Sequence, residues 1–226
     1  MKRTNFFLLI HQGLRRLLFD TATLLQHTDF ADEASAAAAL DAVRETILLF
    51  ETHASHEDVH ILPAVATYEP SVADCFSKEH QEDLRIGQEL IASVETFFLA
   101  GDADSRRDKG IDLLMAFNAF LVFNLEHMAK EERLLNELLL RYYTIAEVMA
   151  VQKRIVESTP PWIYDRLAHW MLLGNNEADT IQWLRAVAAI APPVVYATLL
   201  QKARQVLPEA RSRSLYAKLE ATPELV

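Results

Sequence analysis

Residues 53–60, HASHEDVH, place histidines and acids at two spacings that could each do chemistry. Residues 56–60, HEDVH, match H-E-x-x-H, in which two histidines one helical turn apart bind zinc and the glutamate acts as a base. His53 and Glu57 form a second pair, also one turn apart, that could offer an imidazole and a carboxylate to a metal ion. The side of the helix that faces the core decides between these two hypotheses.

The apolar residues of this segment recur at helical spacing and define an inward face made of Leu40, Val43, Ile47, Phe50, Ala54 and Ile61. At about 100° per residue, Glu57 falls within about 40° of the middle of this face. His53 and His60 flank it at about 80° and 100°, whereas His56 is about 140° away and should be exposed. A zinc-protease site would need His56 as a ligand, so the helical phase favours the pair His53 and Glu57.

A second His-x-x-x-Glu pair occurs at His127 and Glu131. This pair shares one predicted helical face with Leu113, Phe117, Phe120, Asn124, Leu134 and Leu138. Glu132 lies about 100° from Glu131 and is expected to face solvent. Two further histidines, His11 and His80, each stand in the apolar stripe of a separate helical segment.

Six inward-facing groups are therefore expected to meet in one core, and they are His11, His53, Glu57, His80, His127 and Glu131. Two carboxylates buried without compensation would be strongly destabilising, whereas bound cations make their burial favourable. Imidazole and carboxylate ligands suit iron, manganese or zinc. Two His-x-x-x-Glu pairs and two single histidines are enough for two metal ions bridged by the carboxylates.

The segments that carry these residues are long enough for a helical bundle. Helices are expected over about 4–27, 32–63, 71–100 and 105–142, separated by short turns at Asp, Pro or Gly. The chain has only five glycines and almost no alternating Val/Ile/Thr runs, which argues against strands. The predicted fold class is all-α, an up-down-up-down four-helix bundle with additional C-terminal helices.

Residues 1–142 are predicted to form the metal-binding bundle, and residues 143–226 a helical C-terminal extension. Proline pairs at 160–161 and 192–193 break the extension into shorter helices, and it carries all three tryptophans of the chain. Its aromatic residues predict that it packs on the bundle or on a second subunit, so a homodimer through these helices is one expected arrangement. No internal repeat is evident.

Charge and cysteine content limit the partners. The net charge of −10 and the lack of a basic stripe argue against nucleic-acid binding. The single cysteine, Cys75, excludes an internal disulfide and a cysteine-rich metal site, which is compatible with a reducing cytoplasm. The uncharged run at 186–200 contains a proline pair and falls short of the ~20 residues that span a bilayer. We therefore expect a soluble, cytoplasmic protein without a membrane or nucleic-acid partner.

Taken together, these motifs resemble those of the hemerythrin-like (HHE cation-binding) domains. The resemblance covers about residues 4–142 and rests on His11, on HASHEDVHILP with its Pro63, on EHQEDLR around His80 and on HMAKEERLL. It implies a non-haem di-iron centre, for which manganese or zinc could substitute. The implied bridging ligands are Glu57 and Glu131, and the implied terminal ligands are His11, His53, His80 and His127.

The third helix departs from the family pattern. Oxygen-carrying hemerythrins have a second histidine one turn after the third-helix ligand, and this chain has Leu84 there. One iron would then have fewer protein ligands, which leaves a position for solvent, for oxygen, or for His56 or His60 after a rotation of their helix. The acidic stretch 79–83 is expected to be mainly solvated, with Glu82 or Asp83 as an acceptor for a ligand histidine.

Several functions are compatible with such a centre. The favoured hypothesis is a binding protein that binds or senses oxygen, nitric oxide or iron, with the helices after residue 142 passing the signal to a partner. The alternative is a redox enzyme that reduces peroxide or nitric oxide, or that repairs iron–sulfur centres. Repair proteins of that kind usually carry an N-terminal cysteine segment that these 226 residues do not show, so a sensor is preferred to an enzyme.

Two further hypotheses complete the set. A zinc metallopeptidase would rest on His56, Glu57 and His60, and it would need a third protein ligand beside an open cleft. A bundle without metal that acts only as a scaffold is the remaining possibility.

Overall fold

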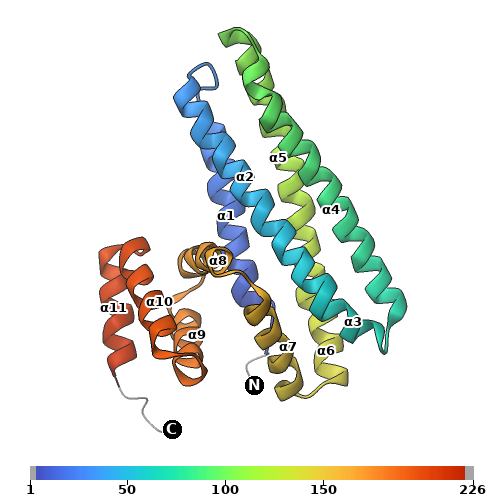
Figure 1. The fold of residues 1–226 in the computed structure, drawn as a ribbon, viewed down its shortest axis with the longest axis vertical. Coiled ribbons are helices and arrows are strands. Elements are labelled where there is room, and N and C mark those ends of the chain that lie inside the picture. Colours follow the sequence, from blue (N-terminus) through green and yellow to red (C-terminus); the bar gives the residue numbers. More distant parts are fainter. Residues whose placement is uncertain (1–3, 222–226) are drawn as a thin grey trace. The chain divides into compact units, whose positions relative to one another are not determined.

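The computed structural model of the protein describes residues 4–221. Within this range nearly every residue is helical and no strand occurs (Figure 1). The chain divides into two compact units, one containing residues 4–7 and 17–159 and the other containing residues 8–16 and 160–221. The predicted fold class, an all-α bundle with additional C-terminal helices, is confirmed.

The bundle helices are interrupted at two points by short π-helical turns (η1 and η3). Their bounds are α1 Leu8–His27, α2 Glu33–His56, η1 Glu57–Ile61, α3 Leu62–Ala66, α4 Pro70–Thr96, α5 Ala103–Lys130, η3 Glu131–Leu135, α6 Asn136–Tyr142 and α7 Ile145–Ser158. A 3-10 turn, η2 Phe97–Leu99, follows α4. Helix α4 packs against both α2 and α5 (Figure 1). Helix α1 is continuous, although its residues are divided between the two units.

Side-chain caps fix where three of these helices begin. The carboxylate of Asp32 accepts a hydrogen bond from the backbone N–H of Ser35 at the start of α2, and Asp102 caps α5 in the same way. At α7, Thr144 and Glu147 form a reciprocal capping box. Such caps satisfy backbone donors that have no partner within the helix. The cap at Asp32 agrees with the expected start of the second helix at about residue 32.

Each π-helical turn begins at the glutamate of a His-x-x-x-Glu pair. Helix η1 starts at Glu57 and η3 starts at Glu131. A π turn inserts one extra residue and so shifts the helical phase of the residues directly after it by about 100°. The shift explains one wrong prediction, because Leu134 is 43% exposed whereas Leu135 is fully buried.

The inward face of α4 also differs from the predicted stripe. Leu84 and Phe98 continue the apolar stripe in which His80 stands, but they are 44% and 48% exposed, and Asp83 is buried instead of Leu84. A Cβ added at Gly87 would lie 3.2 Å from a methyl carbon of Ile47, so α4 approaches α2 closely at this glycine. Asp83 lies one helical turn before Gly87 and so shares the side of α4 that approaches α2.

An apolar cluster next to η1 and η3 closes the end of the bundle. It joins residues of η1, α3, α4, η3, α6 and α7, and its buried members are Phe7, Ile61, Leu62, Val65, Ala73, Phe76, Leu135, Leu138, Leu139, Val148 and Val151.

The stretch Ala103–Tyr142 is long and apolar enough to pass a test for a membrane-spanning helix. One such helix is weak evidence, because the core helix of a soluble protein passes the same test.

The second unit contains four short helices with a regular spacing, α8 Pro161–Gly174, α9 Glu177–Ile190, α10 Pro193–Val206 and α11 Glu209–Glu220. Their N-caps are residues 160, 176, 192 and 208, at intervals of 16 residues. Helices α8 and α10 begin with similar sequences, PPWIY at residue 160 and PPVVY at residue 192. The helices of this unit therefore begin at a regular interval, with PPxxY at the first and third starts, although no internal repeat was expected.

The second unit has its own core. Helix α8 packs against α10, and α9 packs against α10 and α11. Its buried apolar residues are Ala168, Leu172, Leu184, Leu199, Ala203, Leu207 and Leu215. The beginning of α1 belongs to this unit, because Asn175 donates a hydrogen bond to the carbonyl of Leu9. A Cβ at Gly174 would overlap the carbonyl of Gln12, so glycine is required at this approach.

Candidate metal centre

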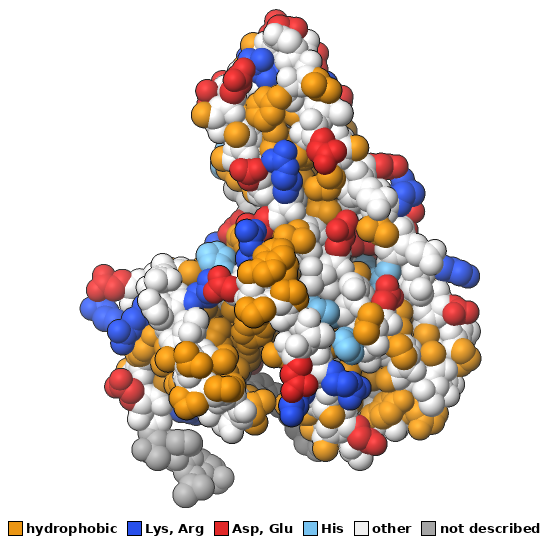
Figure 2. Space-filling view, in the orientation of Figure 1, with side chains coloured by type: hydrophobic (Ala, Val, Ile, Leu, Met, Phe, Trp, Pro, Cys, Tyr) orange, Lys and Arg blue, Asp and Glu red, His pale blue; other side chains and the backbone are white. Residues whose placement is uncertain are grey.

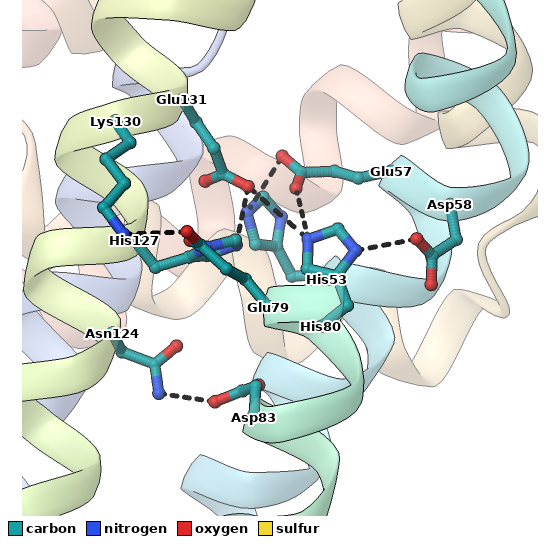
Figure 3. A network of polar contacts seen from close by, with 10 residues as sticks. All are labelled: His53, Glu57, Asp58, Glu79, His80, Asp83, Asn124, His127, Lys130 and Glu131. Atoms are coloured by element: carbon teal, nitrogen blue, oxygen red, sulfur yellow. Dashed lines mark hydrogen bonds and ion pairs between the residues drawn. The ribbon is translucent and has the colours of Figure 1, made fainter. Parts of the chain in front are cut away.

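The candidate site lies inside the first unit, where three helical stretches bring histidines and glutamates together (Figure 3). His53 is in the last turn of α2, and Glu57 begins η1 one turn later. His80 projects from α4. His127 is in the last turn of α5, and Glu131 begins η3 one turn later. The two His-x-x-x-Glu pairs thus enter the site in the same way from two different helices.

One group of possible metal ligands consists of Glu57, His80, His127 and Glu131. One ligand atom from each of them lies within 4.8 Å of the others. His127 Nε2 is 2.8 Å from Glu131 Oε1, and His80 Nε2 is 3.3 Å from Glu57 Oε2 and 3.5 Å from Glu131 Oε1. All four residues are buried. Two imidazole nitrogens therefore point at two carboxylates in an enclosed space.

Glu57 also contacts a third imidazole on its other side. His53 Nε2 lies 3.3 Å from Glu57 Oε1, while His80 Nε2 lies 3.3 Å from Glu57 Oε2. Each carboxylate oxygen thus faces a different histidine, as a carboxylate that bridges two metal ions must do. Ligand atoms of His53, Glu57 and Glu131 also fall within 4.8 Å of one another.

Glu57 is an unusual buried group. It is 2% exposed, and neither of its carboxylate oxygens has a hydrogen-bond partner among the described residues. Nε2 of His80 is in the same situation. Buried polar atoms are almost always paired, and a buried carboxylate without compensation is strongly destabilising. A cation between these atoms would satisfy all three, so the residues present fit a bound metal ion.

The protonation behaviour of the site points the same way. Burial raises the pKa of Glu57, and the negative charge of Glu131 raises it further. Burial opposes a charge on His80, but its contacts with Glu131 and Glu57 outweigh this and raise its pKa to about 11. The pKa of His127 is raised in the same way, mainly by Glu131 against the effect of burial. The paired carboxylates demand positive charge, which a metal ion can supply in place of the histidine protons.

His11 is fully buried on α1, in the stretch 8–16 that belongs to the second unit. Helix α1 continues without a break into the first unit at Leu17. A histidine on an apolar helical stripe was expected here, and its burial agrees with that expectation.

The two outer histidines of the H-E-x-x-H pattern contact the end of α7. His56 Nε2 lies 3.3 Å from Thr159 Oγ1, and His60 Nε2 lies 3.2 Å from Ser158 Oγ. Neither histidine belongs to a group of possible metal ligands among the described residues. His56 was expected on the surface, but it is half-buried beneath this contact. The zinc-protease arrangement therefore finds no support in the geometry.

Two acids that were not predicted to contact the site form hydrogen bonds with the candidate ligands His80 and His127. His80 Nδ1 donates to Asp58 Oδ1 at 2.7 Å, and His127 Nδ1 donates to Glu79 Oε2 at 2.8 Å (Figure 3). The sequence signal for both was their place next to a ligand, since Asp58 follows Glu57 and Glu79 precedes His80.

The acceptors expected on α4 behave differently. Glu82 is bound by the exposed Arg85, so it does not serve a ligand histidine. Asp83 is buried and accepts a hydrogen bond of 2.6 Å from the side chain of Asn124. Burial raises the pKa of Asp83. Neither acid therefore fills the role predicted for it.

The position of the missing third-helix histidine can now be judged. Leu84 points outward, so a histidine there would need α4 to rotate before it could reach the centre. On the inward side, one turn before His80, the buried ring of Phe76 lies 5.8 Å from the ring of His127. Phe123 stacks on the other side of His127, with 6.1 Å between ring centroids. Aromatic rings thus enclose the imidazole on this side of the site.

One face of the molecule can be followed in the space-filling view. On the face drawn in Figure 2, acidic and basic side chains are interspersed with apolar ones, and no continuous basic area appears on that face. The His and Glu side chains that come together do so in the buried site.

Comparison with protein families agrees with this geometry. The family model described as "Hemerythrin HHE cation binding domain" matches residues 3–139, which is more than half of the chain. The chain therefore belongs to the hemerythrin HHE cation-binding family. No curated protein matches it. The resemblance inferred from the motifs is confirmed, and the buried His and Glu groups are where a cation could be held.

Proposed function

We propose that the protein binds two iron ions in a carboxylate-bridged centre and uses this centre to bind or sense a small ligand such as oxygen or nitric oxide. The observation that carries the proposal is the position of Glu57. Its two oxygens are buried, lack hydrogen bonds among the described residues and face two different imidazoles. A single protein carboxylate with this geometry is suited to bridging two cations.

Each ion would have its own histidines and would share both glutamates. We assign His80 and His127 to one ion, because they share a group of possible ligands with Glu57 and Glu131. We assign the remaining predicted histidines, His53 and His11, to the other ion. His11 is included as a buried histidine on a helix that continues into the bundle. The six ligands are those that the sequence predicted.

Iron is the proposed metal because of the donor set. Imidazole nitrogens and carboxylate oxygens without any thiolate suit iron, and they also accept manganese or zinc. Iron would supply the binding of a diatomic ligand or the transfer of electrons to it. The protein would supply the enclosure, because Phe76 and Phe123 cover His127 and keep water from this side of the site.

A sensor is proposed in preference to a redox enzyme. The second unit is a folded helical repeat with its own core, and such repeats commonly provide binding surfaces for other proteins. We propose that it connects the state of the metal centre to a partner in the cytoplasm. Reduction of peroxide or nitric oxide is the alternative use of the same centre.

Metal analysis and absorption spectroscopy test the proposal. Protein loaded with Fe²⁺ without air should contain about two irons per chain, and its spectrum should change when oxygen or nitric oxide is added. A change that saturates at a fixed ratio of ligand to protein supports binding, whereas continued consumption of ligand and reductant supports the enzyme. One zinc ion per chain and a spectrum that never changes would overturn both.

A further inference from the structure

Two carboxylates outside the ligand set contact the two histidines assigned to one of the ions. We propose that Asp58 and Glu79 are positioning residues that orient His80 and His127 for metal binding, and that they set the affinity of this ion position selectively. The inference rests on the proposed metal centre and adds the residues that control one half of it.

The contacts are short and are made by the ring nitrogens that face away from the centre. Asp58 Oδ1 lies 2.7 Å from His80 Nδ1, and Glu79 Oε2 lies 2.8 Å from His127 Nδ1. Because a carboxylate can only accept, both Nδ1 atoms carry the proton. Each Nε2 is then the nitrogen left to bind a metal, and each Nε2 is the atom that points at Glu57 or Glu131.

Each of the two acids links its own helical segment to a histidine of the neighbouring helix. Asp58 sits beside the ligand Glu57 on η1 and reaches to His80 on α4. Glu79 sits beside His80 on α4 and reaches to His127 on α5. Helices η1 and α4 thus each provide a proposed ligand and, one residue away, the acceptor that orients a histidine of another helix. A shift of one helix would disturb the ligand of its neighbour.

Glu79 is itself held in place. Lys130 Nζ lies 2.8 Å from Glu79 Oε1, so both oxygens of this carboxylate are engaged. Its side chain is 21% exposed, whereas that of His127 is 6% exposed. An ion pair near the surface contributes little to the free energy of folding. We therefore expect the main consequence of Glu79 to be the orientation and basicity of His127, not the stability of the fold.

Titration with Fe²⁺ in the absence of air tests the selectivity. The wild type should take up about two equivalents. Asp58→Ala and Glu79→Ala should each weaken one equivalent by about 10–100-fold and leave the other within about threefold. The matched control is Glu82→Ala. Glu82 lies on α4, as Glu79 does, but its side chain pairs with Arg85 and not with a proposed ligand.

Nuclear magnetic resonance of ¹⁵N-labelled histidine separates positioning from a merely structural role. In zinc-loaded wild type, the Nδ1 atoms of His80 and His127 should carry protons, and Glu79→Ala should lose the hydrogen-bonded proton signal of His127 alone. Glu79→Gln should restore much of the iron affinity, because an amide oxygen can still accept from Nδ1. Equal melting temperatures for the metal-free variants would show that the fold is intact.

Distinct outcomes test the two levels of the proposal. If both alanine variants bind two irons with wild-type affinity, the positioning role is overturned while the metal centre stands. If both equivalents weaken to the same extent, the assignment to one ion position is overturned. A wild type that binds no iron, manganese or zinc would overturn the proposed function and this inference with it.

Discussion

Glu57 and Glu131 lie at equivalent points of two different helices, with ligand atoms within 4.8 Å of each other. Each follows a histidine by one turn, and each is the first residue of a π-helical turn. Extra residues of this kind in helices are frequent at functional sites. The same local arrangement therefore occurs twice around the centre. It consists of a histidine, a glutamate one turn later and a π-helical turn that begins at the glutamate.

Replacing Glu57 should separate metal binding from stability. Glu57→Gln keeps the size of the side chain but removes a charge whose burial beside Glu131 is unfavourable, as the raised pKa of Glu57 indicates. We expect the metal-free variant to be as stable as the wild type or more stable by about 1–2 kcal/mol, and to lose metal binding. Chemical denaturation with and without metal measures both. The exposed change Asp41→Asn on α2 is the control and should alter neither.

His53 and His56 form a matched pair three residues apart. His53→Ala should reduce metal content, because His53 faces Glu57 at 3.3 Å. His56→Ala should retain the metal and lose about 0.5–1.5 kcal/mol of stability with its contact to Thr159. Metal analysis of both purified variants gives the answer. Loss of metal in the His56 variant alone would show that the H-E-x-x-H ligands are the ones in use.

Stability of the metal-free protein should fall as pH rises. His80 has a folded pKa of about 11 against an ordinary value of 6.5, so its contribution is complete below 6.5 and is lost as pH rises towards 11. The raised pKa of Glu57 acts in the same direction. Denaturation at several pH values gives the free energy of unfolding of the metal-free wild type and of His80→Gln. The difference between the two values at each pH is the contribution of His80. A difference that stays constant with pH contradicts this account.

Bound metal should reverse that trend. Metal binding needs neutral histidines and charged carboxylates, so protons compete with the ion and affinity rises with pH. Addition of metal at 100 times its dissociation constant should stabilise the fold by about 2.7 kcal/mol per site. Thermal unfolding before and after a chelator measures the effect. The His53→Ala and His80→Gln variants should each show a smaller response than the wild type.

The convergence of the proposed ligands could be predicted from the sequence because these residues lie where the helices are regular. His127 and Glu131 continue the phase set by Phe117 and Phe120, and the π turn begins only at Glu131. Beyond that point the same reasoning misplaced Leu134, since nothing in the local sequence announces the extra residue.

Other features depended on tertiary contacts that periodicity does not contain. On α4, Leu84 fits an apolar stripe as well as its neighbours do, whereas the buried Asp83 accepts a hydrogen bond from Asn124 on α5, a contact that periodicity does not show. The positioning role of Asp58 and Glu79 appears only when the histidine of an adjacent helix is in place. The 16-residue interval of the second unit is evident from where its helices begin. The sequence alone did not reveal it, because α8 and α10 share little beyond PPxxY.

The most direct test of the two-ion centre is a crystal structure of the iron-loaded protein with anomalous diffraction recorded at the iron edge. We predict two peaks per chain, both within bonding distance of Glu57 and Glu131, one beside His80 and His127 and the other beside His53 and His11. A single peak, or a peak bound by His56 and His60, would contradict the carboxylate-bridged centre.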